Sequence, residues 1–338
     1  MSIPRVSMIV PLYNKGGYIL STLQSIIDQT VGAWEAIIVD NGSTDEGPNA
    51  VRRFADGDSR IRLLAEDRRG PGAARNHGLL AASGEWVLFV DADDLLRPYH
   101  LERLLAAASE NRSAQVIAGG QREFVDGSSD QPRLVPVTGS AESLRFTSMA
   151  FAPWQSAAAM IRRTALTEDF HWAEELDPYL SEDTAFWFRL LQFHQPVLCE
   201  NDGLLYRLHA RNSRNEFHDL PRWLCGLNQV YGNNLEFARK FDLPVHWRHC
   251  ESLMRSYDAI RLRATEAARH ETAREAGELG GHWLRRACLA GGWVRPELIL
   301  RQLLGRRLRE RVLPRYRRLR GFVGNEDKEP SLASRPVS

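Results

Sequence analysis

Hydrophobic positions in the first 125 residues fall into short runs that alternate with helix-like stretches of about ten to fifteen residues. Within these runs the apolar residues are consecutive rather than alternating, as in the segment Ile37-Ile38-Val39. Strands that are covered by helices on both faces have this pattern. The sequence therefore predicts an α/β fold with a mainly parallel, doubly wound sheet. The predicted strands are 6–13, 35–41, 60–66, 86–90 and 115–124.

The remainder of the chain has a different pattern. A stretch at 126–143 that is rich in Gly, Ser, Asp and Pro predicts a loop between lobes. A strand at 157–162 and a helix at 181–193 follow, and Ser181 is a suitable N-cap for that helix. From residue 222 to 316 the pattern is almost wholly helical. We predict an α/β domain at 1–215, an α-helical appendage at 216–320 and a polar, disordered tail at 321–338.

The composition narrows the function classes. The 44 basic and 43 acidic side chains nearly cancel, so net charge does not indicate a nucleic-acid partner. The four cysteines form no C-x-x-C pair, which argues against a zinc ribbon or redox dithiol and favours a reducing compartment. The first residues do not resemble a signal peptide, and no run of about 18 apolar residues occurs. We expect a cytoplasmic protein whose membrane contacts, if it has any, are peripheral.

The balanced net charge conceals a basic segment at 301–320, which has nine arginines against one acid. Leu304, Leu308 and Val312 recur in it at helical spacing, so it predicts a basic amphipathic helix. Such a helix suits an anionic membrane surface, here the inner face of the cell membrane. The alternative is a helix that packs on the appendage and exposes a solvated basic face. A helical appendage would also suit a homo-oligomer.

Polar residues follow the first two predicted strands, where a doubly wound sheet binds its ligands. An acidic side chain such as Asp40 can accept hydrogen bonds from a nucleobase or a ribose. The alternative is a polar loop that caps the next helix through Ser43 or Asp45. The candidate nucleotide-binding residues at these two strand ends are Pro11, Tyr13, Asn14, Asp40 and Ser43.

A glycine-containing loop, Gly70-Pro71-Gly72, follows the third strand. Its glycines permit a close approach to the backbone, and Arg75 could neutralise phosphate charge. The loop lacks the third glycine of a dinucleotide-binding motif, which disfavours a nicotinamide-dependent oxidoreductase.

The fourth strand ends in Asp91-Ala92-Asp93-Asp94. Three carboxylates within four residues repel one another unless a cation offsets their charge. Asp91 and Asp93 could converge on a hard divalent ion such as Mg²⁺ or Mn²⁺, which often takes one or two carboxylates plus substrate phosphates. The alternative is a solvated turn that begins the next helix.

Two further candidates lie in the second half of the chain. The pair Glu182-Asp183 begins a predicted helix and could supply a general base, or could simply be an acidic helix start. His209 follows a strand-like run and could ligate a metal or donate to a phosphate, although a lone histidine usually does neither.

Together these motifs resemble the family 2 glycosyltransferases, which have the GT-A fold. The resemblance implies that Asp40 contacts the nucleobase, Asp91 the ribose and Asp93 the metal. It also implies that Arg75 lies near the nucleotide and that the pair Glu182-Asp183 is the catalytic base motif. Either carboxylate could be the base, and we take Asp183 as the candidate. The resemblance covers about residues 4–215 and rests on Ile9-Val10-Pro11-Leu12-Tyr13-Asn14, on Val39-Asp40-Asn41-Gly42-Ser43-Thr44-Asp45, on Gly70 with Ala74-Arg75-Asn76, on Asp91-Ala92-Asp93-Asp94, on Glu182-Asp183 and on Tyr206-Arg207 with His209.

The expected function is therefore an inverting transfer of a sugar from a nucleoside-diphosphate sugar, most simply a UDP-sugar, to a hydroxyl of a glycan or lipid-linked acceptor. Cell-surface polysaccharide synthesis is the expected context. The Q-x-x-R-W motif and membrane helices of the processive synthases of this family are absent from the sequence, so we expect single additions. Two alternatives stay open, a non-catalytic sugar-nucleotide-binding protein and a sugar nucleotidyltransferase.

Overall fold

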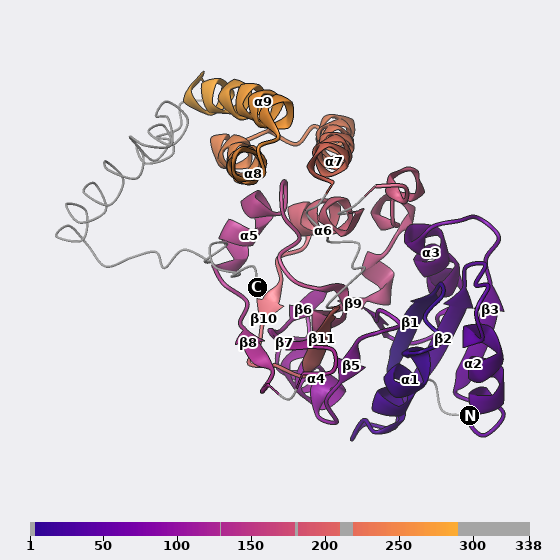
Figure 1. Ribbon diagram of the computed structural model, residues 1–338. Coiled ribbons are helices and arrows are strands. Elements are labelled where there is room, and N and C mark those ends of the chain that lie inside the picture. Colours follow the sequence, from indigo (N-terminus) through magenta and orange to yellow (C-terminus); the bar gives the residue numbers. More distant parts are fainter. Residues whose placement is uncertain (1–3, 129, 180–181, 210–218, 290–338) are drawn as a thin grey trace. The chain divides into compact units, whose positions relative to one another are not determined.

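The computed structural model describes residues 4–128, 130–179, 182–209 and 219–289. Its contacts divide the chain into two compact units, Met1–Pro244 and Val245–Ser338. The first unit contains the α/β sheet, and the described part of the second contains two long helices (Figure 1). The helix α7 (Leu220–Lys240) belongs to the first unit, although it lies within the range 216–320 predicted for the α-helical appendage.

A seven-stranded sheet is the centre of the first unit, and β9 is antiparallel to its two neighbours while the other pairs are parallel. This confirms the prediction of a mainly parallel α/β sheet. Because β1 lies between β2 and β4, the loops after these three strands emerge side by side at one edge. The strand order is β10 (Val197–Leu198), β6 (Val116–Ala118), β9 (Ala159–Arg162), β4 (Trp86–Phe89), β1 (Val6–Leu12), β2 (Trp34–Asp40) and β3 (Ile61–Ala65).

Helices cover both faces of this sheet. Right-handed crossovers place α1 (Ile19–Ile27) and α2 (Gly47–Ala55) on one face, because the order β1, β2, β3 runs in one direction. The chain then returns past β1 to β4, so α3 (Pro71–Ala81) lies on the opposite face, against β1 and β2 (Figure 1). The helix α4 (His100–Glu110) follows β4 and packs on β6.

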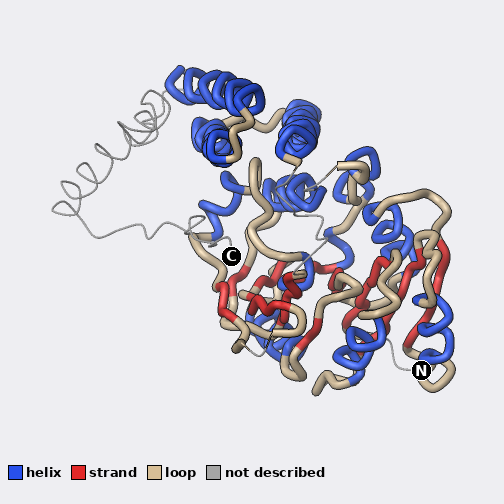
Figure 2. Tube along the Cα trace, viewed as in Figure 1, coloured by secondary structure: helices blue, strands red, loops and turns tan. Residues whose placement is uncertain are grey.

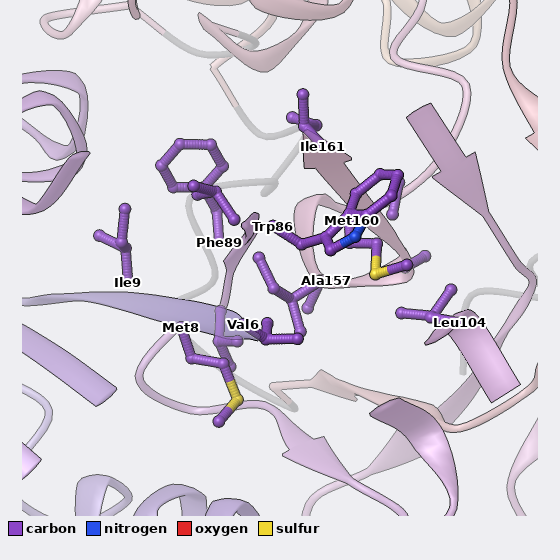
Figure 3. Close-up of a cluster of buried hydrophobic side chains, with 14 of the residues drawn as sticks. Val6, Met8, Ile9, Trp86, Phe89, Leu104, Ala157, Met160 and Ile161 are labelled. Carbon is purple, nitrogen blue, oxygen red and sulfur yellow. The ribbon is translucent and has the colours of Figure 1, made fainter. Parts of the chain in front are cut away.

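The core lies between the sheet and these helices. Figure 2 shows the helices and strands of the chain, and Figure 3 shows a cluster of the buried hydrophobic side chains. Met8 and Ile9 are adjacent in β1 and are both fully buried, which is possible only for a strand covered on two faces. Trp86 and Phe89 of β4 and Met160 of β9 extend the same cluster. Each such side chain contributes roughly 1.5–3 kcal/mol through burial.

A second, four-stranded sheet contains β5 (Leu95–Leu96), β11 (Leu204–Leu208), β7 (Gln121–Val125) and β8 (Arg133–Val135). The strand predicted at 115–124 is thus two strands, β6 and β7, in different sheets. The chain changes sheet at Gly119, where a Cβ atom would lie 2.7 Å from atoms of Asn201. The loop predicted at 126–143 contains β8, which pairs with β7 although it has no apolar alternation.

The helix predicted at 181–193 is confirmed as α6 (Glu182–Phe193), while its proposed cap Ser181 lies outside the described residues. The remaining elements of this unit are α5 (Ala141–Thr147) and four short 3-10 helices, η1 (Ser156–Ala158), η2 (Arg163–Ala165), η3 (Glu168–Phe170) and η4 (Glu174–Leu176).

The second unit contains α8 (Trp247–Glu266) and α9 (His270–Leu289), which pack against each other. Within the described ranges, no helix has the length and apolar content needed to cross a membrane. The basic segment 301–320 and the tail 321–338 lie outside the described residues. The peripheral membrane contact, the cytoplasmic location and a homo-oligomer therefore stay predictions.

Candidate functional site

The loops after β1 and β2 form one hydrogen-bonded surface. The backbone amide of Asn14 donates to Oγ of Ser43 at 3.2 Å, and the backbone amide of Ser43 donates to Oδ1 of Asp40 at 3.0 Å. Asn14 has a φ of 51°, a left-handed conformation that asparagine tolerates better than most residues. Tyr13 beside it is 46% exposed, and Pro11 pairs with β2 in the sheet. The five strand-end candidates of the sequence are therefore neighbours.

The capping alternative for this loop is only partly realised. Oδ1 of Asp45 accepts from the Gly47 amide at the start of α2, and its Oδ2 accepts from the Gly16 amide. Ser43 instead accepts from Asn14, so its hydroxyl belongs to the strand-end surface rather than to the helix.

Asn41 has a structural role that its sequence position did not reveal. Its side chain is buried; Oδ1 accepts from the Gly70 amide at 2.7 Å, and Nδ2 donates to the carbonyls of Glu66 and Arg68. An aspartate could accept in the same way but could not donate. Asn41 therefore joins the end of β2 to the loop that leads into α3.

The three carboxylates after β4 have different surroundings. Oδ2 of Asp93 contacts the Lys15 ammonium and lies 2.7 Å from Nε2 of His209. Burial alone would raise the pKa of Asp93, but the Lys15 charge and the hydrogen bonds from Lys15 and His209 outweigh it and lower that pKa. Asp91 instead accepts from Arg75, and its side chain is 35% exposed.

Asp94 points into the protein and is 2% exposed. Its Oδ1 accepts from the backbone amide of Arg207 in β11, and the Arg207 guanidinium donates back to the Asp93 carbonyl at 2.7 Å. Burial, together with the negative charges of Asp91 and Asp93, raises the pKa of Asp94 well above its usual value. Asp94 therefore links the carboxylate turn to the strand that leads to His209.

Arg75 joins the carboxylate turn to α6. Its guanidinium donates to Oδ1 of Asp91 at 2.9 Å and to Oε1 of Glu182 at 3.3 Å. It lies 4.1 Å over the ring of Trp172, which in turn stacks at 4.2 Å on Phe186 of α6. These contacts keep a buried guanidinium charged, because two carboxylates and an aromatic face replace its water.

Glu182 and Asp183 are chemically distinct although they are adjacent. Glu182 accepts from Arg75, whereas Oδ1 of Asp183 accepts from the Thr184 amide at 2.8 Å. Burial and then the negative charge of Glu182 raise the pKa of Asp183 to about 7. The Asp183 side chain is nevertheless partly exposed. It can therefore exchange a proton with a bound molecule near neutral pH.

The described residues contain no cluster of three or more His, Cys, Asp or Glu side chains in a metal-binding arrangement. Asp91, Asp93 and His209 nevertheless supply carboxylate and imidazole donors, and Asp93 already attracts the Lys15 ammonium. Hard divalent ions need only one or two carboxylates when substrate phosphates complete the shell. The donor set therefore fits Mn²⁺ or Mg²⁺ bound together with a diphosphate.

Three residues at this site make contacts that the sequence pattern did not predict. Lys15 contacts Asp93, Trp172 supports Arg75, and Asp177 accepts from the first amides of α3. Lys15 follows Asn14 directly, so its place at a strand end was an available signal. Trp172 and Asp177 lie far along the chain from their partners, and no local pattern marks them.

The mainly parallel sheet, flanked by helices and with acidic side chains at one edge, defines a GT-A-type fold. Residues 7–169 match the family model described as Glycosyl transferase family 2, which identifies this segment of the chain as a member of that family.

Three proteins with sequences similar to this chain support this assignment. The chain is 37% identical over 126 residues to the putative glycosyltransferase EpsH of Bacillus subtilis, which covers 37% of this chain and 36% of that protein. It is 40% identical over 107 residues to the succinoglycan biosynthesis protein ExoO of Rhizobium meliloti, covering 31% and 30% of the two chains. These matches thus span about a third of each relative's length. The uncharacterized glycosyltransferase EpsJ of Bacillus subtilis is matched more fully, over 71% of this chain and 72% of its own, at 27% identity.

Two solved structures have the same fold. S. aureus TarS in complex with UDP-GlcNAc superposes with a TM-score of 0.53 at 19% identity, over 81% of this chain and 90% of that one. The mannosyltransferase PcManGT from Pyrobaculum calidifontis, in complex with GDP-Man and Mn²⁺, has a TM-score of 0.50 at 18% identity, over 96% and 82%. At these identities the likeness shows a common fold.

Proposed function

We propose that this protein is an inverting, non-processive glycosyltransferase that moves a sugar from a nucleoside-diphosphate sugar, a UDP-sugar in the simplest case, to a hydroxyl of a glycan or lipid-linked acceptor. The observation that carries the proposal is the position of Arg75 between Asp91 and Glu182. One guanidinium connects a carboxylate on the sheet edge with the acidic pair that contains Asp183. A donor site and a proton acceptor are thereby held next to each other.

The donor occupies the edge formed by β1, β2 and β4 in this proposal. Asp40 contacts the nucleobase, with Pro11, Tyr13, Asn14 and Ser43 around it, and Asp91 contacts the ribose. The exposed ring of Tyr13 suits stacking on a base. Arg75 lies near the nucleotide but acts through Asp91, because its guanidinium is already bound by carboxylates.

The diphosphate lies beside Asp93. Asp93, with Asp91 and His209 as neighbouring donors, would hold Mn²⁺ or Mg²⁺, and the ion would supply Lewis-acid stabilisation of the charge on the departing diphosphate. Lys15 reaches the same place and can donate to a phosphate oxygen. The presence of UDP-GlcNAc, or of GDP-Man with Mn²⁺, in the two structural neighbours supports a donor of this class.

Asp183 is the general base. As the acceptor oxygen bonds to the anomeric carbon, its proton passes to the Asp183 carboxylate, and the bond from that carbon to the diphosphate oxygen breaks on the opposite face. This single displacement inverts the anomeric centre. A base with a pKa of about 7 matches this task, because it is ionised near neutral pH and still binds the proton firmly.

The similarity to the succinoglycan biosynthesis protein ExoO supports cell-surface polysaccharide synthesis as the context. The test is release of nucleoside diphosphate from a panel of sugar nucleotides, with Mn²⁺, Mg²⁺ or a chelator, with and without candidate acceptors. We expect metal-dependent release that Asp93→Ala and Asp183→Asn reduce by about 10²-fold or more. Donor binding without release by folded wild-type protein would favour a non-catalytic sugar-nucleotide-binding protein, and release of pyrophosphate would favour a nucleotidyltransferase.

A further inference from the structure

The helix α3 is capped by a residue from another part of the chain. Its N-cap residue, Gly70, has no side chain, and the first amides of a helix have no carbonyl partner within the helix. Oδ1 of Asp177 accepts from the Gly72 amide at 2.7 Å, and Oδ2 accepts from the Ala73 amide at 3.1 Å. Asp177 is 7% exposed and stands 105 residues after Gly72. One buried carboxylate therefore satisfies two amides that the helix leaves unpaired.

The glycines before α3 accommodate this carboxylate. A Cβ atom on Gly70 would lie 2.0 Å from Oδ2 of Asp177, and one on Gly72 would lie 2.6 Å from Oδ1. Gly70 also has a φ of +136°, which side chains disfavour. The side chain that approaches the backbone of this loop closely is that of Asp177.

The segment around Asp177 is joined to α3 at other points as well. Asn76 of α3 exchanges two hydrogen bonds with the backbone of Trp172, at 3.0 and 2.9 Å. Its Nδ2 also donates to Glu174, which accepts two hydrogen bonds from Arg68. The segment 172–177 and the first turns of α3 thus form one hydrogen-bonded unit.

This unit connects the two sides of the candidate active site. The segment 172–177 leads to α6, which begins with Glu182 and Asp183, and α3 carries Arg75. Arg75 closes the circuit because it donates to Glu182. The position of the guanidinium relative to the acidic pair is therefore determined by how α3 is held against the segment that precedes α6.

We propose that Asp177 is a positioning residue that holds α3 against the start of α6 and so keeps Arg75 on Glu182, beside the base Asp183. This inference rests on the proposed function. Loss of the cap would free the first turn of α3 and let Arg75 move away from Glu182. The Glu182 charge would then be less compensated, and the pKa of Asp183 would rise further.

The test compares Asp177→Asn and Asp177→Ala with Asp169→Asn in the full chain. Asp169 lies in the nearby helix η3, where its exposed carboxylate pairs with Lys240 outside the active-site network. Hydrogen exchange at the Gly72 and Ala73 amides reports the cap, and the pH profile of sugar transfer reports the base. We expect faster exchange, a transfer rate lower by about 10²-fold and an acidic limb at higher pH in both Asp177 variants, but none of these changes in Asp169→Asn.

If the Asp177 variants exchange these amides faster but keep the transfer rate and the acidic limb of the wild type, Asp177 is a cap without a positioning role. That result would overturn the inference. Failure of both Asp177 variants to fold where Asp169→Asn folds would assign Asp177 to global stability and would also overturn it. Absence of transfer by the wild type would refute the proposed function instead, and the exchange result would still report the cap.

Discussion

Arg75 donates a hydrogen bond of 2.9 Å to Oδ1 of Asp91, so a buried residue of α3 orients a carboxylate at the end of the fourth strand. The same guanidinium reaches Glu182. Replacing it leaves two carboxylates without their shared cation. The consequences for stability and for the base can be measured separately.

Arg75→Met is expected to lower the free energy of unfolding by up to about 3 kcal/mol. This is the low end for breaking a buried pair, because the Asp91 side chain is 35% exposed and can recover water. Urea unfolding at neutral pH measures the loss. Arg62→Met, which removes an arginine that is 43% exposed, is the control and should cost less. Equal losses would contradict the buried role of Arg75.

The pH profile of transfer should show an acidic limb near pH 7. Asp183 is the base in the proposed reaction, and its pKa of about 7 means that protonation removes the active form below that pH. Rate measurements from pH 5 to 9 at saturating metal and donor test this. A rate that stays constant down to pH 5 would exclude Asp183 as the titrating base.

Asp183→Asn should be more stable than the wild type above pH 7. The folded-state pKa of Asp183 is raised, so the folded protein binds the proton more tightly than the unfolded chain does. The wild type consequently loses stability as the pH rises from the unfolded pKa near 4 through the folded value near 7. Asparagine lacks this charge penalty. Thermal unfolding at pH 5 and pH 8 should show the larger difference between the two proteins at pH 8, and an unchanged difference would contradict the raised pKa.

Asn41→Asp should lower the free energy of unfolding by about 1–3 kcal/mol, because the carbonyls of Glu66 and Arg68 lose their donor and a carboxylate enters a buried position. Asn49→Asp in α2 is the matched change at an exposed position and should have an effect within about 0.5 kcal/mol. Denaturant unfolding of the two variants gives the comparison. Similar costs would show that the Asn41 donors contribute little.

Gly70→Ala should lower the free energy of unfolding by at least about 1–3 kcal/mol, since alanine is strained at a φ of +136° and its Cβ would meet Asp177. Gly232→Ala is the control with the opposite expected sign. Gly232 lies exposed within α7, and a Cβ atom there would have none of the described atoms outside its own helix turn within 4 Å, so alanine should stabilise that helix by about 0.5–1 kcal/mol. Thermal unfolding of both variants decides between a strained and an open site.

Local patterns predicted β1, β2, β3, β4 and β9 of the main sheet and placed the candidate residues at its edge. Consecutive apolar residues such as Ile37, Ile38 and Val39 indicate a strand buried on both faces, because burial depends on each residue's own side chain. The position of Asp40 and Asp91 after such strands follows from the same pattern. The splitting of 115–124 at Gly119 did not follow, because it depends on the backbone of Asn201.

The sequence alone thus established a doubly wound α/β sheet with acidic residues at its strand ends and an acidic pair at the start of a later helix. The tertiary structure decided which of these charges are compensated: Lys15 on Asp93, Arg75 between Asp91 and Glu182, and Asp177 on the first turn of α3. Ion pairs and caps between distant segments need no periodicity in either partner. They arise only when the packed sheet and helices bring those side chains together.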